Sequence, residues 1–330
     1  IRDSSVTGVQ TCALPISVRR ETGQFLSADG KSKIHVAKWL PEKEPVAVLQ
    51  MVHGMQEYIE RYEPFARYLA GQGFAVIGHD HIGHGASVSD ESRWGIMEGT
   101  HPSDIMVEDM YRNYCLIREE YPGLPHFILG HSMGSYMLRK MIAVKAQDLA
   151  DCNGAIIMGT GSESNLKIFM GKIILHVIAA FHSWEYRSPF ASGLMFGAPY
   201  KDFDVTGKEP ERSWLTKDIE IVKGYRDDPA CSFMFSLSGF KALLEATSFD
   251  NSAKNIAKVP KDLSVIFVSG DRDPVGNLGK GVKMAYEKFA AAGMRDVTMK
   301  LYPGDRHEIL NELDRQQVYE DLYQWMRERM

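Results

Sequence analysis

Short apolar runs alternate along this chain with longer segments in which apolar residues recur every three or four positions. The short runs predict buried strands, and the three-to-four spacing predicts helices with one buried face. The predicted strands span 33–40, 46–52, 74–78, 126–129, 154–158, 263–268 and 297–302, and the predicted helices span 60–71, 103–120, 133–144, 281–292 and 313–329. This alternation is typical of an α/β fold with a mostly parallel central sheet and helices on both faces. We expect Ser103 to be the N-cap of the second helix.

The alternation stops between residues 161 and 249. This segment has no clear strand, and it opens with a strongly apolar, helix-like stretch at 166–181. A long interruption of an α/β pattern is usually a functional insertion rather than a bare loop. We therefore predict a helical cap, or lid, over 161–249, and a core formed by 18–160 together with 250–330.

Residues 1–17 stand outside the pattern. The stretch 6–16 resembles the translation of a short-read sequencing adapter, which predicts a non-native tail joined to a metagenomic gene fragment. The alternative is a native flexible tail, and in either case the segment is excluded from fold reasoning. It lacks the apolar run of a signal peptide, although the true N-terminus can be missing. No stretch of 18 uncharged apolar residues occurs, so we predict no transmembrane helix.

Composition narrows the classes of function. The 330 residues carry a net charge of −5, with 44% hydrophobic and 25% charged residues, as in soluble globular proteins. No basic stripe indicates a nucleic-acid partner. The four cysteines have no CxxC spacing and the eleven histidines form no H-E-x-x-H, which argues for free thiols in a reducing compartment and against a metal site. We predict a cytoplasmic bacterial protein that needs no metal or organic cofactor.

The segment Gly130–Gly134 has the pattern Gly-x-Ser-x-Gly, with an apolar run before it and helical spacing after it. Strand, Gly-x-Ser-x-Gly and helix together are the context of a nucleophile elbow, a tight turn that exposes the serine hydroxyl. The amide of Met133 would then face a developing negative charge at a helix N-terminus. Ser132 is therefore the candidate nucleophile.

A serine hydroxyl needs an imidazole to take its proton, and the imidazole needs a carboxylate to orient it. Asp273 and His307 follow Ser132 in the chain order of α/β-hydrolases, and each comes just after a predicted strand. Asp271 and Asp305 also lie close to these positions. Asp273 fits a Gly-x-x-Asp pattern after its strand, so we choose it and interpret Asp271 as a turn residue.

A second oxyanion donor is expected in the loop after strand 46–52. Gly54 would let the backbone approach the substrate there, and the amide of Met55 would be the donor. The glycine-rich segment 80–87 follows another strand. It lacks the lysine of a P-loop and the third glycine of a dinucleotide-binding loop, so we interpret it as a structural turn.

Five segments resemble motifs of the monoacylglycerol lipase and lysophospholipase group of α/β-hydrolases, which sequence also groups with serine aminopeptidases. They are HGMQEYIERY (53–62), GHDHIGHGAS (78–87), GHSMGS (130–135), GDRDPVGN (270–277) and YPGDRHEILNE (302–312). The resemblance spans nearly all of 25–330 and implies an α/β-hydrolase fold with a helical cap. It also implies Ser132, Asp273 and His307 as a catalytic triad, with Met55 and Met133 as oxyanion-hole donors.

The chain departs from the family at Tyr58, where a histidine is common, and at Ile82, where many relatives have arginine. The cap is the least similar part. Its apolar stretch 166–181 is either a lid that takes up an acyl chain or transiently touches a membrane or micelle, or a surface packed on the core. The candidate substrate-binding residues are Gly54, His131, Met195, Phe196, Phe233 and Phe235, since acyl sites are mostly apolar.

These observations predict a serine carboxylic-ester hydrolase acting on a small ester or lipid, most simply a monoacylglycerol lipase or lysophospholipase-like esterase. One alternative is an amidase or aminopeptidase on the same triad, with cap carboxylates binding the substrate ammonium group. The candidates for that role are Glu185, Asp202, Asp204, Glu209 and Glu211. Another alternative is a non-catalytic ligand-binding relative, which would not require the triad.

Overall fold

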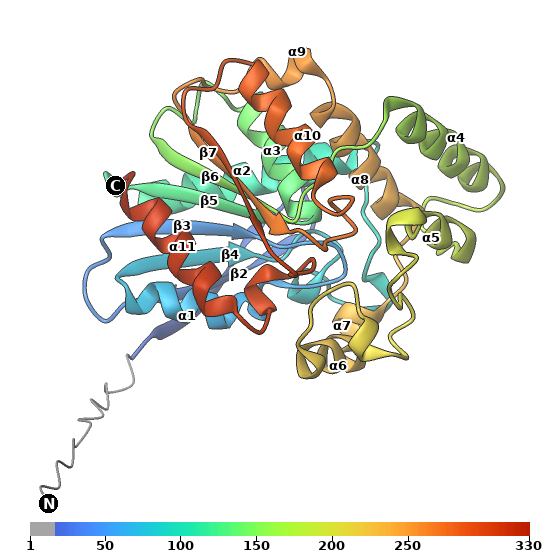
Figure 1. The fold of residues 1–330 in the computed structure, drawn as a ribbon, viewed down its shortest axis with the longest axis horizontal. Helices are drawn as coiled ribbons and strands as arrows, with labels where there is room; N and C mark the ends of the chain where they lie inside the picture. The colour runs from blue at the N-terminus through green and yellow to red at the C-terminus, as the bar shows by residue number, and fades with distance from the viewer. Residues whose placement is uncertain (1–16) are drawn as a thin grey trace, which may run out of the picture.

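A single eight-stranded sheet forms the centre of the protein (Figure 1). The computed structural model describes residues 17–330, so the prediction for the N-terminal tail falls outside it except at residue 17. The strands are β1 (Arg19–Leu26), β2 (Lys33–Leu40), β3 (Ala47–Val52), β4 (Phe74–His79), β5 (His126–His131), β6 (Cys152–Met158), β7 (Ser264–Gly270) and β8 (Val297–Tyr302). Their order is β1-β2-β4-β3-β5-β6-β7-β8, and all pairs beyond β4 are parallel. The predicted mostly parallel sheet is confirmed.

Helices cover both faces of this sheet, and further helices lie beyond one end of it. The described helices are α1 (Glu63–Gly71), α2 (Pro102–Glu120), α3 (Met133–Val144), α4 (Asn165–Phe181), α5 (Pro189–Met195), α6 (Ile219–Asp227), α7 (Pro229–Ser232), α8 (Leu237–Asp250), α9 (Ala253–Ile256), α10 (Lys280–Ala291) and α11 (Arg315–Arg327). Side chains alternate across a strand, so β5 directs Phe127 and Leu129 to one core and Ile128 to the other. The first core includes α1 and α11, and the second includes α2, α3 and α10.

Three local features differ from the sequence prediction. β1 was not predicted, because it is an antiparallel edge strand whose residues are mostly exposed and show no apolar contrast. The predicted helix 60–71 begins with a 3-10 turn at Ile59–Tyr62, and α1 itself starts at Glu63. Ser103 is not an N-cap. It lies inside α2, where its hydroxyl donates to Glu245 and accepts from Lys140, because the helix already begins at Pro102.

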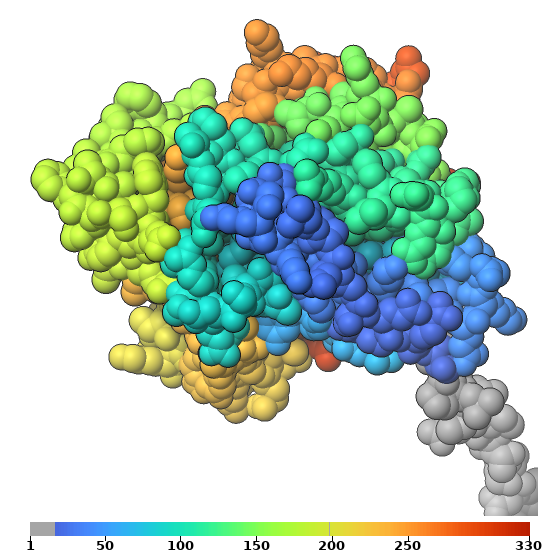
Figure 2. Space-filling model, turned by 180° about the vertical axis from the view of Figure 1, so that it is seen from behind, coloured from blue at the N-terminus to red at the C-terminus, as the bar shows by residue number. Residues whose placement is uncertain are grey.

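The predicted cap segment lies beyond one end of the sheet, with α4 and α5 next to each other and α6 and α7 below them (Figure 1). From behind, α4 and α5 form a lobe at one side of the molecule (Figure 2). α8, which we assigned to the cap, packs against α2 and α3 as well as α4. None of the described helices is long and apolar enough to cross a membrane.

Candidate active site

The turn between β5 and α3 holds Ser132 in a strained conformation. Its φ and ψ are 52° and −121°, in a region that residues with a side chain rarely occupy. The turn is fixed from both sides. The Ser132 amide donates to the Met158 carbonyl at 2.9 Å, and a Cβ on Gly134 would lie 2.4 Å from the Val52 carbonyl oxygen. Only glycine allows this approach, so the predicted strand–turn–helix arrangement of the nucleophile elbow is present.

Asp273 and His307 meet at the same end of the sheet. His307 Nδ1 lies 3.0 Å from Asp273 Oδ2, and both side chains are buried. Ser269 donates to Asp273 Oδ2 at 2.9 Å, and the Val275 amide donates to Oδ1 at 2.8 Å. Burial alone would raise the pKa of Asp273, but His307 and these hydrogen bonds outweigh it and hold the pKa below its usual value. An ionised carboxylate therefore orients the imidazole.

The other two candidate acids have different partners. Asp271 accepts from the Gly304 amide at 2.8 Å, as expected of a turn residue. Asp305 is paired with Lys217 at 2.6 Å. Of the three aspartates, Asp273 is thus the one that the structure brings to His307.

Gly54 lies directly against Ser132, the candidate nucleophile. A Cβ at Gly54 would lie 2.9 Å from the Cβ of Ser132 and 2.5 Å from Glu57 Oε1. The Gly54 amide donates to that carboxylate at 2.6 Å, which fixes the loop that carries Met55. Met55 follows in this loop and Met133 is the first residue of α3, so both predicted donors are close to Ser132 in the chain or in space.

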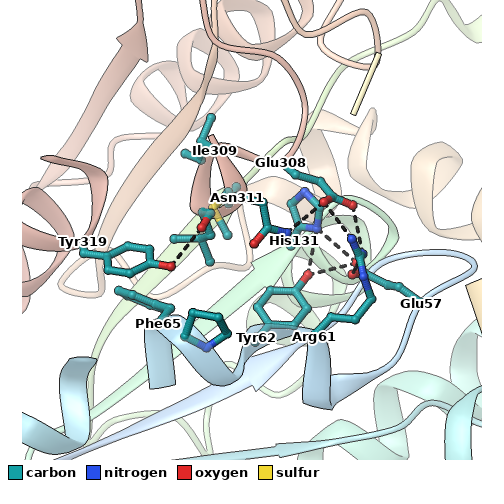
Figure 3. A pocket seen from close by; sticks show the side chains of 12 residues that line it. Glu57, Arg61, Tyr62, Phe65, His131, Glu308, Ile309, Asn311 and Tyr319 are labelled. Carbon is teal, nitrogen blue, oxygen red and sulfur yellow. Dashed lines mark hydrogen bonds and ion pairs between the residues drawn. The ribbon is translucent and has the colours of Figure 1, made fainter. Parts of the chain in front are cut away.

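Figure 3 shows a cluster of four ionisable side chains, which are Glu57, Arg61, His131 and Glu308. Arg61 donates to Glu57 at 2.7 Å and reaches both carboxylate oxygens of Glu308, at 2.9 and 2.8 Å. His131 Nδ1 lies 3.1 Å from Glu57 and 2.8 Å from the hydroxyl of Tyr62. All of these side chains are nearly or fully buried. The cluster lines a small cavity together with apolar residues of α1 and the segment after His307.

The pKa directions in this cluster favour the charged forms. Burial lowers the pKa of His131, but the hydrogen bond and negative charge of Glu57, with the charge of Glu308, outweigh burial and raise it. The pKa values of Glu57 and Glu308 are both held low by Arg61 and His131 despite burial. The two carboxylates therefore lie against the Arg61 guanidinium and favour the protonated form of His131. His131 Nε2 lies 3.3 Å from the His307 carbonyl, so both of its ring nitrogens already have protein partners. That His131 binds substrate stays a prediction.

The predicted acyl-site residues differ in what surrounds them. Phe196 packs with Tyr200 and Trp214, and the Trp214 ring lies 5.1 Å from that of His307. Phe235, in contrast, is 1% exposed and packs within the core near Phe240.

Phe233 is half-buried and stacks on Trp94, and Met195 packs against the same core as Phe235. The sequence analysis missed Trp214, because nothing in the chain around it indicates that it faces a loop 93 residues away.

The glycine-rich segment after β4 is a structural turn, as predicted. Asp80 accepts from the amides of Ile59 and Ala86, each at 2.8 Å. Its carboxylate, His35 and Glu60 bring ligand atoms within 4.8 Å of one another, the grouping among the described residues that could hold a metal ion. Arg20 already pairs with Glu60 at 2.8 Å, and the two amides occupy Asp80. The side-chain atoms that could bind a metal ion here therefore already have partners within the protein.

The fold and the serine elbow define the class of the protein as an α/β-hydrolase. A family model described as serine aminopeptidase, S33, matches residues 43–314, and the chain belongs to this family. It is a serine hydrolase.

Individual relatives of this chain are named as lipases and an esterase. Human monoglyceride lipase is 25% identical over 92% of this chain and 90% of its own length, and a monoacylglycerol lipase of Mycolicibacterium smegmatis is 24% identical over 94% and 98%. A thermostable carboxyl esterase of Bacillus coagulans, solved with glycerol, superposes with a TM-score of 0.85 at 26% identity, over 95% of this chain and 99% of that one.

Proposed function

We propose that this chain hydrolyses carboxylic esters, with monoacylglycerols as preferred substrates. Ser132 Oγ bonds to the ester carbonyl carbon while its proton passes to His307. His307 gives that proton to the departing alcohol as the carbon–oxygen bond breaks. Water then attacks the acyl-enzyme, again with His307 taking a proton, and the fatty acid leaves. The amides of Met55 and Met133 stabilise the oxyanion.

One observation carries this proposal. An ionised, fully buried Asp273 orients His307 at the end of the sheet where the elbow holds Ser132. The names of the relatives, monoglyceride lipases and a carboxyl esterase, support an ester as the substrate class. Phe196 and the neighbouring Tyr200, which pack on Trp214, are our candidates for the substrate pocket near His307.

An aminopeptidase or amidase on the same residues is the second candidate, since the family model carries that description. It would need a free carboxylate for the substrate ammonium group. Glu185 pairs with Arg93 at 3.1 Å, and Glu209 pairs with Arg212 at 2.9 Å. Asp204 accepts hydrogen bonds within its own loop. Three of the five candidate carboxylates are therefore used within the protein, which favours the ester, whereas Asp202 and Glu211 are exposed.

A single substrate panel tests the proposal. It contains p-nitrophenyl esters of graded acyl length, 1-monoacylglycerols and aminoacyl-anilides, each with the Ser132→Ala variant as control. We expect hydrolysis of the esters and monoacylglycerols, abolished in the variant, and labelling of Ser132 by a fluorophosphonate probe. Cleavage of anilides alone would support the aminopeptidase. An unlabelled Ser132 in folded protein would support a ligand-binding relative.

We also propose that α4 and α5 contact lipid surfaces. Eight apolar side chains there are each at least 41% exposed, which is more than packing on the core explains. They are Leu166, Phe169, Met170, Ile173, Val177, Phe181, Phe190 and Leu194. The double variant Phe169→Asp, Phe181→Asp should lose cosedimentation with phosphatidylcholine vesicles. Met284→Asp, at a similarly exposed apolar position on α10, should not. Equal binding by both variants would refute this contact.

A cytoplasmic location is part of the proposal. Cys115, Cys152 and Cys231 are free thiols in the described part of the chain, which is typical of a reducing compartment.

A further inference from the structure

A short segment of the predicted cap, residues 213–216, lies along the loop that carries His307. The His307 amide donates to the Trp214 carbonyl at 3.3 Å, and the Glu308 amide donates to the Leu215 carbonyl at 2.7 Å. Arg306 donates to the carbonyls at both ends of the segment. These bonds fix the backbone of Trp214 relative to His307. The loop that carries His307 therefore limits where the Trp214 ring can lie.

The ring of His307 lies next to two other flat rings. The Trp214 ring is 5.1 Å away, with an angle of 36° between the planes, and the His131 ring is 4.7 Å away at 39°. Asp273 Oδ2 lies 3.0 Å from Nδ1. The two rings and the carboxylate together restrict the orientation of the His307 imidazole.

The two neighbouring rings differ electrostatically. His131 belongs to the cluster with Glu57, Arg61 and Glu308, and the hydrogen bond and charge of Glu57 raise its pKa despite burial. A protonated His131 disfavours a second positive charge on His307, although Asp273 and the two glutamates oppose this effect. The face of an indole attracts cations through its quadrupole. Trp214 thus supplies attraction for the imidazolium that forms when Ser132 is deprotonated.

We propose that Trp214 is a positioning residue, which packs against the His307 ring and stabilises its protonated form during the reaction. The kinetic part of this inference rests on the proposed function, in which His307 is the base. The contact itself does not, because Trp214 and His307 touch whatever the substrate is.

The first test is the pH dependence of kcat/KM for p-nitrophenyl butyrate in the wild type, Trp214→Phe and Trp214→Leu. Activity falls at low pH when His307 is protonated before the reaction. Loss of the indole face makes that protonation harder, so the acid limb should move down by about 0.5–1 pH unit in Trp214→Leu. It should move less in Trp214→Phe, which keeps an aromatic face. We expect kcat to fall about threefold to tenfold in Trp214→Leu, with KM changed less. An unmoved acid limb in a folded Trp214→Leu variant would overturn the proposal.

The second test does not need turnover. A protonated imidazole in contact with an indole quenches its fluorescence, so the emission of Trp214 should report on His307. The signal is the wild-type emission minus that of Trp214→Phe, measured from pH 5 to 8. It should titrate at the same midpoint as the acid limb and be lost in His307→Gln.

Trp184 provides a matched control, because its ring lies 5.0 Å from that of His176. Trp184→Phe removes another indole that contacts a histidine and should leave the Trp214 signal intact. If the Trp214 signal did not change with pH while ester hydrolysis was normal, the proposed role of Trp214 would be overturned and the proposed function would stand. A titrating signal in a protein that hydrolyses no ester would overturn the proposed function and support the contact.

Discussion

Replacing Gly54 by alanine should impair catalysis far more than folding. The added Cβ would lie 2.9 Å from the Cβ of Ser132 and 2.5 Å from Glu57 Oε1. Carbon atoms in contact are separated by about 3.5 Å or more, so Ser132 or the loop must move by roughly 0.6 Å. The hydrogen bond from the Gly54 amide to Glu57, 2.6 Å long, would be strained by the same movement.

The expected magnitudes follow from that displacement. A misplacement approaching 1 Å at a reacting group costs about 100-fold in rate, or about 2.7 kcal/mol of transition-state stabilisation. Overpacking of this kind reduces the free energy of unfolding by roughly 1–3 kcal/mol. We therefore expect Gly54→Ala to lower kcat for p-nitrophenyl butyrate by about two orders of magnitude, while thermal unfolding shows a folded protein with a modestly lower Tm.

Gly224→Ala is the matched control. Gly224 lies within α6, and a Cβ there has no atom within 4 Å. Alanine should stabilise this helix by about 0.5–1 kcal/mol and leave kcat unchanged. If Gly54→Ala retained kcat within threefold of the wild type at an unchanged Tm, the close approach of Gly54 to Ser132 would be refuted as a constraint on the active site.

Three further changes should have defined outcomes. Asp273→Asn should lower kcat about 10⁴-fold in a folded protein, because the amide favours the wrong tautomer of the imidazole; an effect below tenfold would contradict its role. Glu308→Gln should reduce the free energy of unfolding by about 3 kcal/mol in urea denaturation, since Arg61 keeps its charge and loses a buried partner; no change would contradict a buried ion pair. Burial lowers the pKa of His53 to about 3 and that of His84 to about 4, so the unfolded chain binds protons there that the folded protein cannot. Each of these histidines should therefore lower the stability by about 1.4 kcal/mol per pH unit as the pH drops from 6.5 towards 4, so the pH dependence of the urea midpoint between pH 6.5 and 5 should change in His84→Gln relative to the wild type, and an unchanged dependence would contradict this.

Much of the fold follows from local pattern. The central strands are buried on both faces and therefore appear as continuous apolar runs, which the sequence shows without ambiguity. β1 has no such signal, because an exposed edge strand is specified by its pairing with β2 rather than by its own residues. Ser103 has the residue type of an N-cap, yet its position inside α2 is decided by contacts with Glu245 and Lys140.

The proposed active site also has features that follow from local pattern and features that do not. The elbow around Ser132 is a contiguous motif, and the positions of Asp273 and His307 follow from the rule that side chains after parallel strands meet at one edge of the sheet. The choice of Asp273 over Asp305 could be made from its place after the strand, and the hydrogen bond to His307 agrees with it.

Sequence by itself therefore determined the alternation of strands and helices, the family and the candidate nucleophile, acid and base, because each depends on neighbouring residues or on chain order. Only the tertiary structure decided that Arg61 reaches Glu308 and that Trp214 covers His307. These contacts join segments 247 and 93 residues apart in the chain. A long-range contact depends on the direction and length of two side chains once the backbone is placed, and no local pattern carries that information.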